Sequence, residues 1–151
     1  MNPSHKLLIA TNNPGKLREL QTLMAELPLK LVGLADVGIY EDVIETGSTL
    51  EKNASLKATT YAKLSGIVTL ADDSGLEVEA LGGKPGVFSA RYAGLGATDA
   101  QRIAYLLRKL DGIPEMKWSA RFRCVIAVVY PNKEPSFYAG KCSGRIVKKA
   151  R

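Results

Sequence analysis

Histidine and cysteine are scarce in this sequence of 151 residues, which contains one histidine, His5, and two cysteines, Cys124 and Cys142. A single histidine excludes a metal centre built from several histidines, a Ser-His-Asp triad and a Cys-His dyad. We expect the two cysteines to be reduced and packed, and the sequence leaves open whether they lie close enough to pair. Any catalysis must therefore use carboxylates, lysine or arginine, and a divalent metal ion would be their natural complement.

Long apolar runs are also missing, since no segment approaches the roughly 20 residues of a membrane helix. The first residues, Met1 to Lys6, lack the apolar core of a signal peptide, so we expect a cytoplasmic protein that does not bind membranes. Repeats, low-complexity tracts and linkers are lacking too. With 46% hydrophobic and 24% charged residues, the chain fits one ordinary domain that spans residues 1–151.

The charges are unevenly distributed along the chain, whose net charge is +6. Eight of the 15 acidic residues fall between residues 41 and 79, whereas residues 141–151 carry five basic residues and no acidic one. An acidic middle between basic ends suits a metal site beside an anion site better than a uniform nucleic-acid surface. A basic nucleic-acid binder remains the weaker alternative, and we expect no nucleic-acid partner.

Two adjacent carboxylates, Asp72 and Asp73, directly follow the apolar run Ile67–Ala71. An ionised carboxylate that is buried without a partner costs several kcal/mol or becomes protonated. We therefore expect the pair at the end of a buried strand, next to water or to a hard cation with oxygen ligands. Ser74-Gly75 predicts a sharp turn after it. The strict alternation of Leu76–Ala80 then predicts an exposed strand, with Glu77 and Glu79 facing solvent.

A strand, a polar turn and a helix are predicted at the start of the chain. Lys6–Thr11 is an apolar run, Asn13 can cap a helix, and Pro14 suits the first helical position. Free N–H groups at a helix start attract phosphate, and Lys16 adds a full positive charge there. The turn lacks the glycine spacing of a P-loop. By itself it indicates an ordinary capped turn with a surface lysine.

The remaining patterns predict an α/β fold with a mixed central sheet and flanking helices. Thr49 caps a helix that runs to about Ser65, and the box Thr98–Gln101 opens another. Asn53 and Lys57 share a face of the first of these helices, and we expect that face to be solvated. Further strands are predicted in four segments: Leu29–Leu34, Ser119–Tyr130, Ser136–Cys142 and Arg145–Val147.

Five stretches of the sequence are similar to the inosine/xanthosine triphosphate pyrophosphatase family, in order and in spacing. The longest, ADDSGLEVEALGGKPGVFSARYAG at Ala71–Gly94, is highly specific. The other four are Ile9–Leu20, Glu45–Ala58, Ala97–Asp99 and Ala120–Val125. The resemblance covers essentially the whole chain. It implies an elongated mixed sheet with flanking helices, a homodimer, and Mg²⁺-dependent hydrolysis of ITP, dITP and XTP to the monophosphate and pyrophosphate.

The resemblance also implies roles for individual residues. Asp73 would be the catalytic carboxylate that accepts a proton, and it would share Mg²⁺ with Glu45 and Asp72. Substrate contacts are implied for six residues: Thr11, Asn12, Asn13, Lys16, Lys57 and Ser74. This reverses the interpretation of the polar turn as a plain cap. For Arg91 a structural role and a position near the substrate are equally open.

The sequence departs from the family pattern in two places. One of the two acids that often precede Thr-Gly is replaced by Ile44, which leaves Glu45. The glycine-rich and Ser-His-Arg segments that enclose the purine in the family lie beyond the given residues, so we expect a chain without the family's C-terminal part. The alternative function is therefore a weak or inactive nucleotide-binding remnant.

Overall fold

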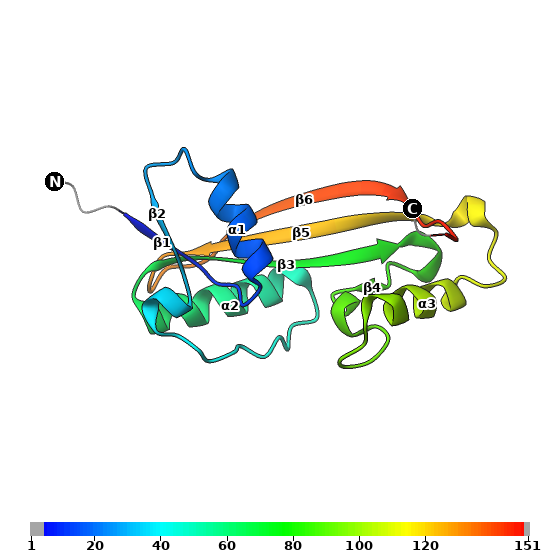
Figure 1. Cartoon of the computed structure of the whole chain (residues 1–151), viewed down its shortest axis with the longest axis horizontal. Coiled ribbons are helices and arrows are strands. Elements are labelled where there is room, and N and C mark those ends of the chain that lie inside the picture. The colour runs from blue at the N-terminus through cyan, green and yellow to red at the C-terminus, as the bar shows by residue number, and fades with distance from the viewer. Residues whose placement is uncertain (1–4, 150–151) are drawn as a thin grey trace. The chain divides into compact units, whose positions relative to one another are not determined.

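The computed structural model of the protein describes residues 5–149, and its chain forms two compact units (Figure 1). The first unit contains the described residues up to Asp73 together with Val125–Tyr138. The second contains Ser74–Cys124 together with the described residues from Ala139 onward. Each unit has its own cluster of buried apolar side chains. The single domain expected from the sequence stays a prediction.

A six-stranded sheet in the order β2-β1-β3-β5-β6, with the short β4 paired to β3, forms the framework. Strand β1 pairs in parallel with β2 and with β3, whereas β4 runs antiparallel to β3, so the sheet is mixed as predicted. The strands are β1 (Lys6–Ile9), β2 (Lys30–Gly33), β3 (Val68–Val78), β4 (Pro85–Gly86), β5 (Ser119–Val129) and β6 (Ser136–Arg145). The three main helices are α1 (Pro14–Leu23), α2 (Leu50–Ser65) and α3 (Asp99–Lys109). Four 3₁₀ turns complete the described elements: η1 (Ala35–Val37), η2 (Glu79–Leu81), η3 (Ser89–Arg91) and η4 (Glu115–Lys117).

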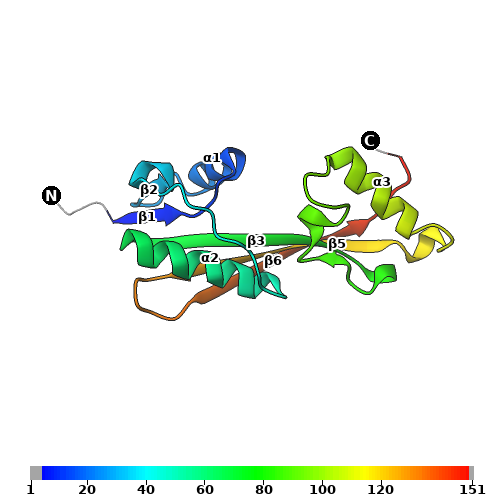
Figure 2. The ribbon, with the colours of Figure 1, turned by 90° about the horizontal axis from the view of Figure 1, so that it is seen from below.

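In the first unit, α1 and α2 lie on opposite sides of β1 and the neighbouring part of β3 (Figure 2). Because side chains alternate along a strand, Leu7 and Ile9 pack with Leu70 and α1, whereas Leu8 and Thr69, both fully buried, belong to the other face. This part of the sheet is thus covered on both faces, as expected for parallel strands that are continuous apolar runs.

The helix boundaries agree with the predicted caps. The Asn13 side chain caps α1, the Thr49 side chain caps α2, and Gly66 ends α2 in a left-handed conformation. The capping box of Thr98 and Gln101 is formed at α3. The spacing of apolar residues along residues 50–65 predicts Leu64 on the packed side of α2, but it is exposed.

The predicted turn at Ser74-Gly75 is wrong, because β3 runs through it without a break. Gly75 lies where β4 approaches β3, and a Cβ atom at Gly75 would overlap the carbonyl group of Gly86. Glycine at position 75 therefore allows β4 to pair closely with β3, and it does not reverse the direction of the chain. Consequently Asp72 and Asp73 lie within a long strand, not at the end of one.

Two further predictions about strands are corrected. Glu77 is largely buried because its carboxylate contacts Arg121 Nε at 2.6 Å and Arg123 at 3.6 Å, while Glu79 is exposed as expected. The segments Ser136–Cys142 and Arg145–Val147 were predicted as two strands, but residues 136–145 form the single strand β6. Alternation in sequence cannot reveal such ion pairs or the continuity of an exposed strand.

In the second unit, Val78, Leu106, Leu110 and Trp118 form the buried cluster beneath α3. The helical spacing of Ile103, Leu106 and Leu110 predicts all three in the core, but Ile103 is exposed. Both cysteines are free thiols; Cys124 is half-buried, and Cys142 is exposed, contrary to the expected packing. Within residues 5–149, none of the helices has the length and apolar character needed to cross a membrane.

Tyr61 attaches the loop before α2 to the helix. Its ring is fully buried, and its hydroxyl donates a hydrogen bond to the Glu41 carbonyl oxygen at 2.9 Å. Burial, reinforced by the negative charge of Asp42, raises the pKa of the Tyr61 hydroxyl above its ordinary value. The neutral hydroxyl is therefore part of the folded state.

Replacement of this tyrosine tests its contribution. We expect Tyr61→Phe to lower the free energy of unfolding by about 1 kcal/mol near neutral pH, because the hydrogen bond to the Glu41 carbonyl oxygen is lost. Since the raised pKa keeps the folded-state hydroxyl protonated while the unfolded chain ionises, this advantage is present below about pH 10 and is lost as pH rises further. Urea unfolding across that range measures it. Tyr138→Phe, at an exposed tyrosine, is the control and should change stability by less than about 0.5 kcal/mol; an equally small effect of Tyr61→Phe would contradict the expectation.

The close approach of β4 to β3 predicts a second effect. Gly75→Ala should lower the free energy of unfolding by about 1–3 kcal/mol, because the added methyl group overlaps backbone atoms that cannot move aside cheaply. Gly140→Ala in β6, where the added methyl group meets nothing within 4 Å, is the matched control. Equal urea midpoints for the two variants would show that β4 is not held against β3.

Candidate active site

Several predicted site residues of the first unit lie where β1 ends, in the turn that follows the strand and in the part of β3 beside it. The Ala10 N–H donates to the Leu70 carbonyl oxygen at 2.8 Å, which continues the parallel pairing of β1 with β3. Because the two strands run in the same direction, the turn after β1 lies beside the residues of β3 that follow Leu70. In α/β sheets, ligands bind at such carboxyl ends of strands.

The polar turn that follows β1 is built around Asn13. Its side-chain oxygen accepts hydrogen bonds from the N–H groups of Gly15, at 2.9 Å, and Lys16, at 3.3 Å. The Thr11 hydroxyl accepts from the N–H of Asn13 at 3.1 Å. The predicted capped turn is thus confirmed. Its N–H groups already have an oxygen acceptor, so a phosphate oxygen would have to take the place of the Asn13 side chain.

Lys16 and Asp72 form an ion pair across this turn. The Lys16 Nζ atom lies 2.6 Å from Asp72 Oδ2, and the Asp72 side chain is 11% exposed. The lysine is on α1 and remains 40% exposed. The pair offsets the cost of burying the carboxylate and leaves the ammonium group accessible to a second anion.

Asp73 is buried beside α2, on the other side of the strand. The Asn53 Nδ2 group donates to Asp73 Oδ2 at 3.1 Å, and Asn53 Oδ1 accepts from the N–H of Gly47 at 2.7 Å. Asn53 is fully buried, so the solvated face predicted for it is wrong. Its position in the apolar stripe of α2, three residues after Leu50 and four before Lys57, was the signal that could have revealed this.

The two adjacent acids of β3 therefore have partners on opposite sides of the sheet. Asp72 contacts α1 and Asp73 contacts α2, as expected from the alternation of side chains along a strand. The resemblance to the family implies that Asp72 and Asp73 bind the same metal ion, and it does not predict that they face opposite sides of the sheet. The metal role of Asp72 stays a prediction.

Glu45 is held by the same helix as Asp73. The Lys57 Nζ atom lies 2.7 Å from Glu45 Oε1, and the lysine side chain is 17% exposed. Residues four apart are neighbours on a helix surface, so Asn53 and Lys57 hold Asp73 and Glu45 on the same face of α2. This face therefore combines two carboxylates with one ammonium group and one amide.

The other predicted residues occupy different surroundings. Asn12 donates to Asp42 Oδ1 at 3.0 Å, a contact that the sequence did not suggest. Ser74 and Arg91 belong to the second unit; Ser74 is exposed on β3, and the Arg91 guanidinium stacks on the Phe88 ring at 5.1 Å. These observations leave the substrate roles of the three residues as predictions.

The donor atoms of the first unit suit a hard cation only in combination with a ligand. Within residues 5–149, no three side chains of His, Cys, Asp or Glu come together as a ready metal site. Mg²⁺ is usually held by one or two carboxylates together with water and phosphate oxygens. Glu45 and Asp73, on one face of α2, supply such carboxylates and fit that mode of binding.

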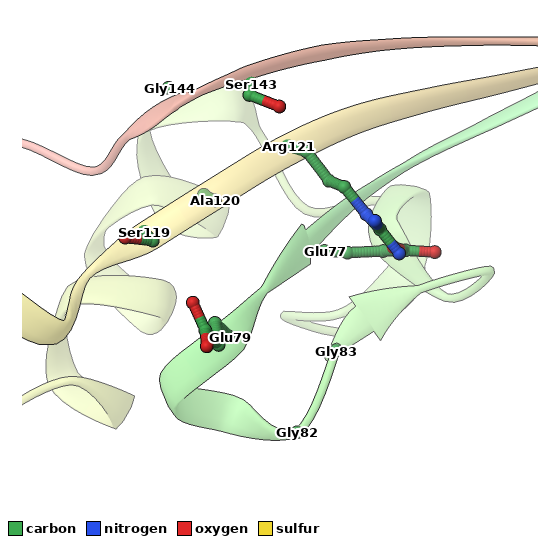
Figure 3. Close-up of a pocket in the computed structure, with 9 residues that line it drawn as sticks. All are labelled: Glu77, Glu79, Gly82, Gly83, Ser119, Ala120, Arg121, Ser143 and Gly144. Atoms are coloured by element: carbon green, nitrogen blue, oxygen red, sulfur yellow. The ribbon is translucent and has the colours of Figure 1, made fainter.

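The second unit contains a separate cavity of about 530 Å³ between the β3–β4 segment and strands β5 and β6 (Figure 3). The ion pair of Glu77 and Arg121 lies in its wall, and Glu79, Ser119 and Ser143 complete its polar lining. None of the predicted site residues lines it. The cavity is therefore described apart from the candidate active site.

Comparison with known proteins places this geometry in a family. Residues 7–151 match the Ham1 family. A dITP/XTP pyrophosphatase of Shouchella clausii is 46% identical over 145 residues, which are 96% of this chain and 73% of that protein. The dITP/XTP pyrophosphatase of Bacillus subtilis is 42% identical over 144 residues, with 95% and 73% covered.

Solved structures agree with this assignment. A HAM1 protein from Coxiella burnetii has a TM-score of 0.91 at 40% identity, with 97% of this chain and 75% of that chain covered. A nucleoside-triphosphatase described as a dITP/XTP pyrophosphatase, from Mycobacterium abscessus, has a TM-score of 0.82 at 42% identity, with 95% and 75% covered. The chain belongs to the Ham1 family.

Proposed function

We propose that the protein hydrolyses non-standard purine nucleoside triphosphates, namely ITP, dITP and XTP, to the monophosphate and pyrophosphate with the help of Mg²⁺. The observation that carries the proposal is the pair of buried acids in β3, each held by a polar group from a different helix, beside the capped turn after β1. The names of the relatives as dITP/XTP pyrophosphatases supply the substrate class.

Asp73 is the residue that accepts the proton in this proposal. A water molecule forms a bond to the α-phosphorus while the bond from that phosphorus to the bridging oxygen breaks and pyrophosphate leaves. The water proton passes to the Asp73 carboxylate, which the amide of Asn53 orients through Oδ2. A positioned carboxylate is a suitable general base for such a step.

The lysines neutralise the charge that develops on the polyphosphate. Lys16 lies in the first turn of α1, directly after β1. Lys57 lies on α2 and contacts Glu45 of the preceding loop. Phosphoryl transfer depends mainly on positioning and on stabilisation of negative charge. We propose further substrate contacts from three residues of the turn itself, Thr11, Asn12 and Asn13. By resemblance to the family, we also propose a contact from Ser74.

Glu45 and Asp73, and by resemblance Asp72, would hold Mg²⁺, which would neutralise phosphate oxygens when bound. Lys57 and Lys16 pair with Glu45 and Asp72, and Asn53 donates a hydrogen bond to Asp73. We therefore expect the chain to fold without the metal. By resemblance to the family we also propose a homodimer in the cytoplasm, without nucleic-acid or membrane partners.

Replacement of the proposed base is the direct test. Asp73→Asn should reduce pyrophosphate release from dITP or XTP by about 10²–10⁴-fold, because the amide cannot accept the water proton. Asp111→Asn, at an exposed acid of the second unit, is the matched control and should leave the rate unchanged. A wild-type chain that releases pyrophosphate from dATP as fast as from dITP would contradict the substrate class.

Removal of the metal separates the enzyme from the alternative of an inactive nucleotide-binding remnant. EDTA should abolish pyrophosphate release, and Mg²⁺ in excess should restore it, because the oxygen ligands proposed here bind a hard cation. The urea midpoint without nucleotide should stay the same, because side chains of the protein already contact each of the three acids. Nucleotide binding in calorimetry without any pyrophosphate release from the wild-type chain would instead identify the remnant.

A further inference from the structure

We infer that Asn53 is a positioning residue that fixes the Asp73 carboxylate relative to the loop that carries Glu45. The inference rests on the proposed function, in which Asp73 accepts the proton. Asn53 lies on α2, Asp73 on β3 and Glu45 on the loop before α2, so one side chain joins three separate parts of the first unit.

The two hydrogen bonds of Asn53 require an amide. The partner on β3 is a carboxylate oxygen, which accepts, and the partner in the loop is the backbone N–H of Gly47, which donates. A side chain between them must offer a donor and an acceptor at the same time, as a primary amide does. Because Asn53 is fully buried, water does not replace a partner that is lost.

Gly47 makes this contact possible through close approach. A Cβ atom at Gly47 would lie 2.6 Å from Asn53 Oδ1 and 2.7 Å from Lys52 Cβ, closer than atoms pack. The loop therefore reaches α2 only with glycine at this position. Glu45 is two residues earlier, so the position of its carboxylate depends on the same contact.

Asn53 and Lys57, which are four residues apart on α2, together fix the two acids. One turn after Asn53, Lys57 contacts Glu45 at 2.7 Å, so a single rigid helix sets the positions of both acids. Catalytic geometry is held more precisely by such elements than by loops. Loss of a hydrogen-bonded partner behind a catalytic or ligating group typically costs 10–100-fold in activity or affinity.

The test uses the direction of the hydrogen bond, in which the Asn53 amide donates and the Asp73 carboxylate accepts. Asn53→Asp keeps the acceptor for Gly47 but places a second carboxylate against Asp73. We expect kcat for pyrophosphate release from dITP at saturating Mg²⁺ to fall by about 10–100-fold. KM should change by a smaller factor, because Lys16 and the turn after β1, which also contact the polyphosphate in the proposal, are unchanged.

The double variant Asn53→Asp with Asp73→Asn reverses the hydrogen bond and provides a measurement that is independent of activity. Its side chains can again satisfy both partners, so we expect its urea midpoint to return to that of the wild type. Its activity should stay absent, because the carboxylate is now on α2. A midpoint that is as low as in the single variant Asn53→Asp would show that the two side chains are not coupled.

Asn132→Asp, in the exposed loop before β6, is the matched control and should leave kcat and the urea midpoint unchanged. If Asn53→Asp does not fold, Asn53→Ser serves instead, because it shortens the side chain without adding charge, and its kcat should fall at least about tenfold. A folded variant at residue 53 whose kcat equals that of the wild type would overturn the inference. An inactive wild-type chain would overturn the proposed function instead, and the stability measurements would still decide whether Asn53 and Asp73 are coupled.

Discussion

The burial of two adjacent carboxylates in β3 is the constraint on which the candidate site depends. Asp72 and Asp73 are both buried residues, so each must have a compensating group within the protein. Lys16 on α1 and Asn53 on α2 provide these groups. The need to compensate the two acids thus links the strand to both helices that cover it.

The two acids differ in the kind of group that compensates them. The Lys16 ammonium group forms an ion pair with Asp72, whereas the uncharged amide of Asn53 donates a hydrogen bond to Asp73. In the proposed function Asp73 is the reactive acid, and the ion pair with Asp72 holds Lys16 beside the turn.

Local signals in the sequence were sufficient for most of the framework. Asn13, Thr49 and Thr98 cap helices through contacts with residues close in the chain, and these caps appear where they were expected. The apolar runs that form β1 and β2 were equally clear. Each of these features depends on neighbours within a few positions, so spacing alone reveals it.

Features that depend on distant partners were not predictable in the same way. Gly75 follows a serine and resembles a turn, yet it serves the approach of β4, which is ten residues away in sequence. Asn53 resembled a surface residue because its partners, Gly47 and Asp73, lie on a loop and a strand outside its helix. Glu77 likewise was assigned to solvent because Arg121 follows it by more than forty positions.

The resemblance to a family and the geometry contribute different information about the site. The resemblance names Glu45, Asp72 and Asp73 as a group, because motifs preserve identity and order along the chain. The geometry divides this group, because neighbours on a strand face opposite sides while residues four apart on a helix face the same side. Glu45 and Asp73 are far apart in sequence and are nevertheless held together by Lys57 and Asn53. In the proposed function, the cation of the bound polyphosphate would meet Glu45 and Asp73 on the α2 face. The polyphosphate itself would meet Lys16 at the turn after β1. Cleavage next to the α-phosphorus requires positive charge at both places to stabilise the negative charge that develops.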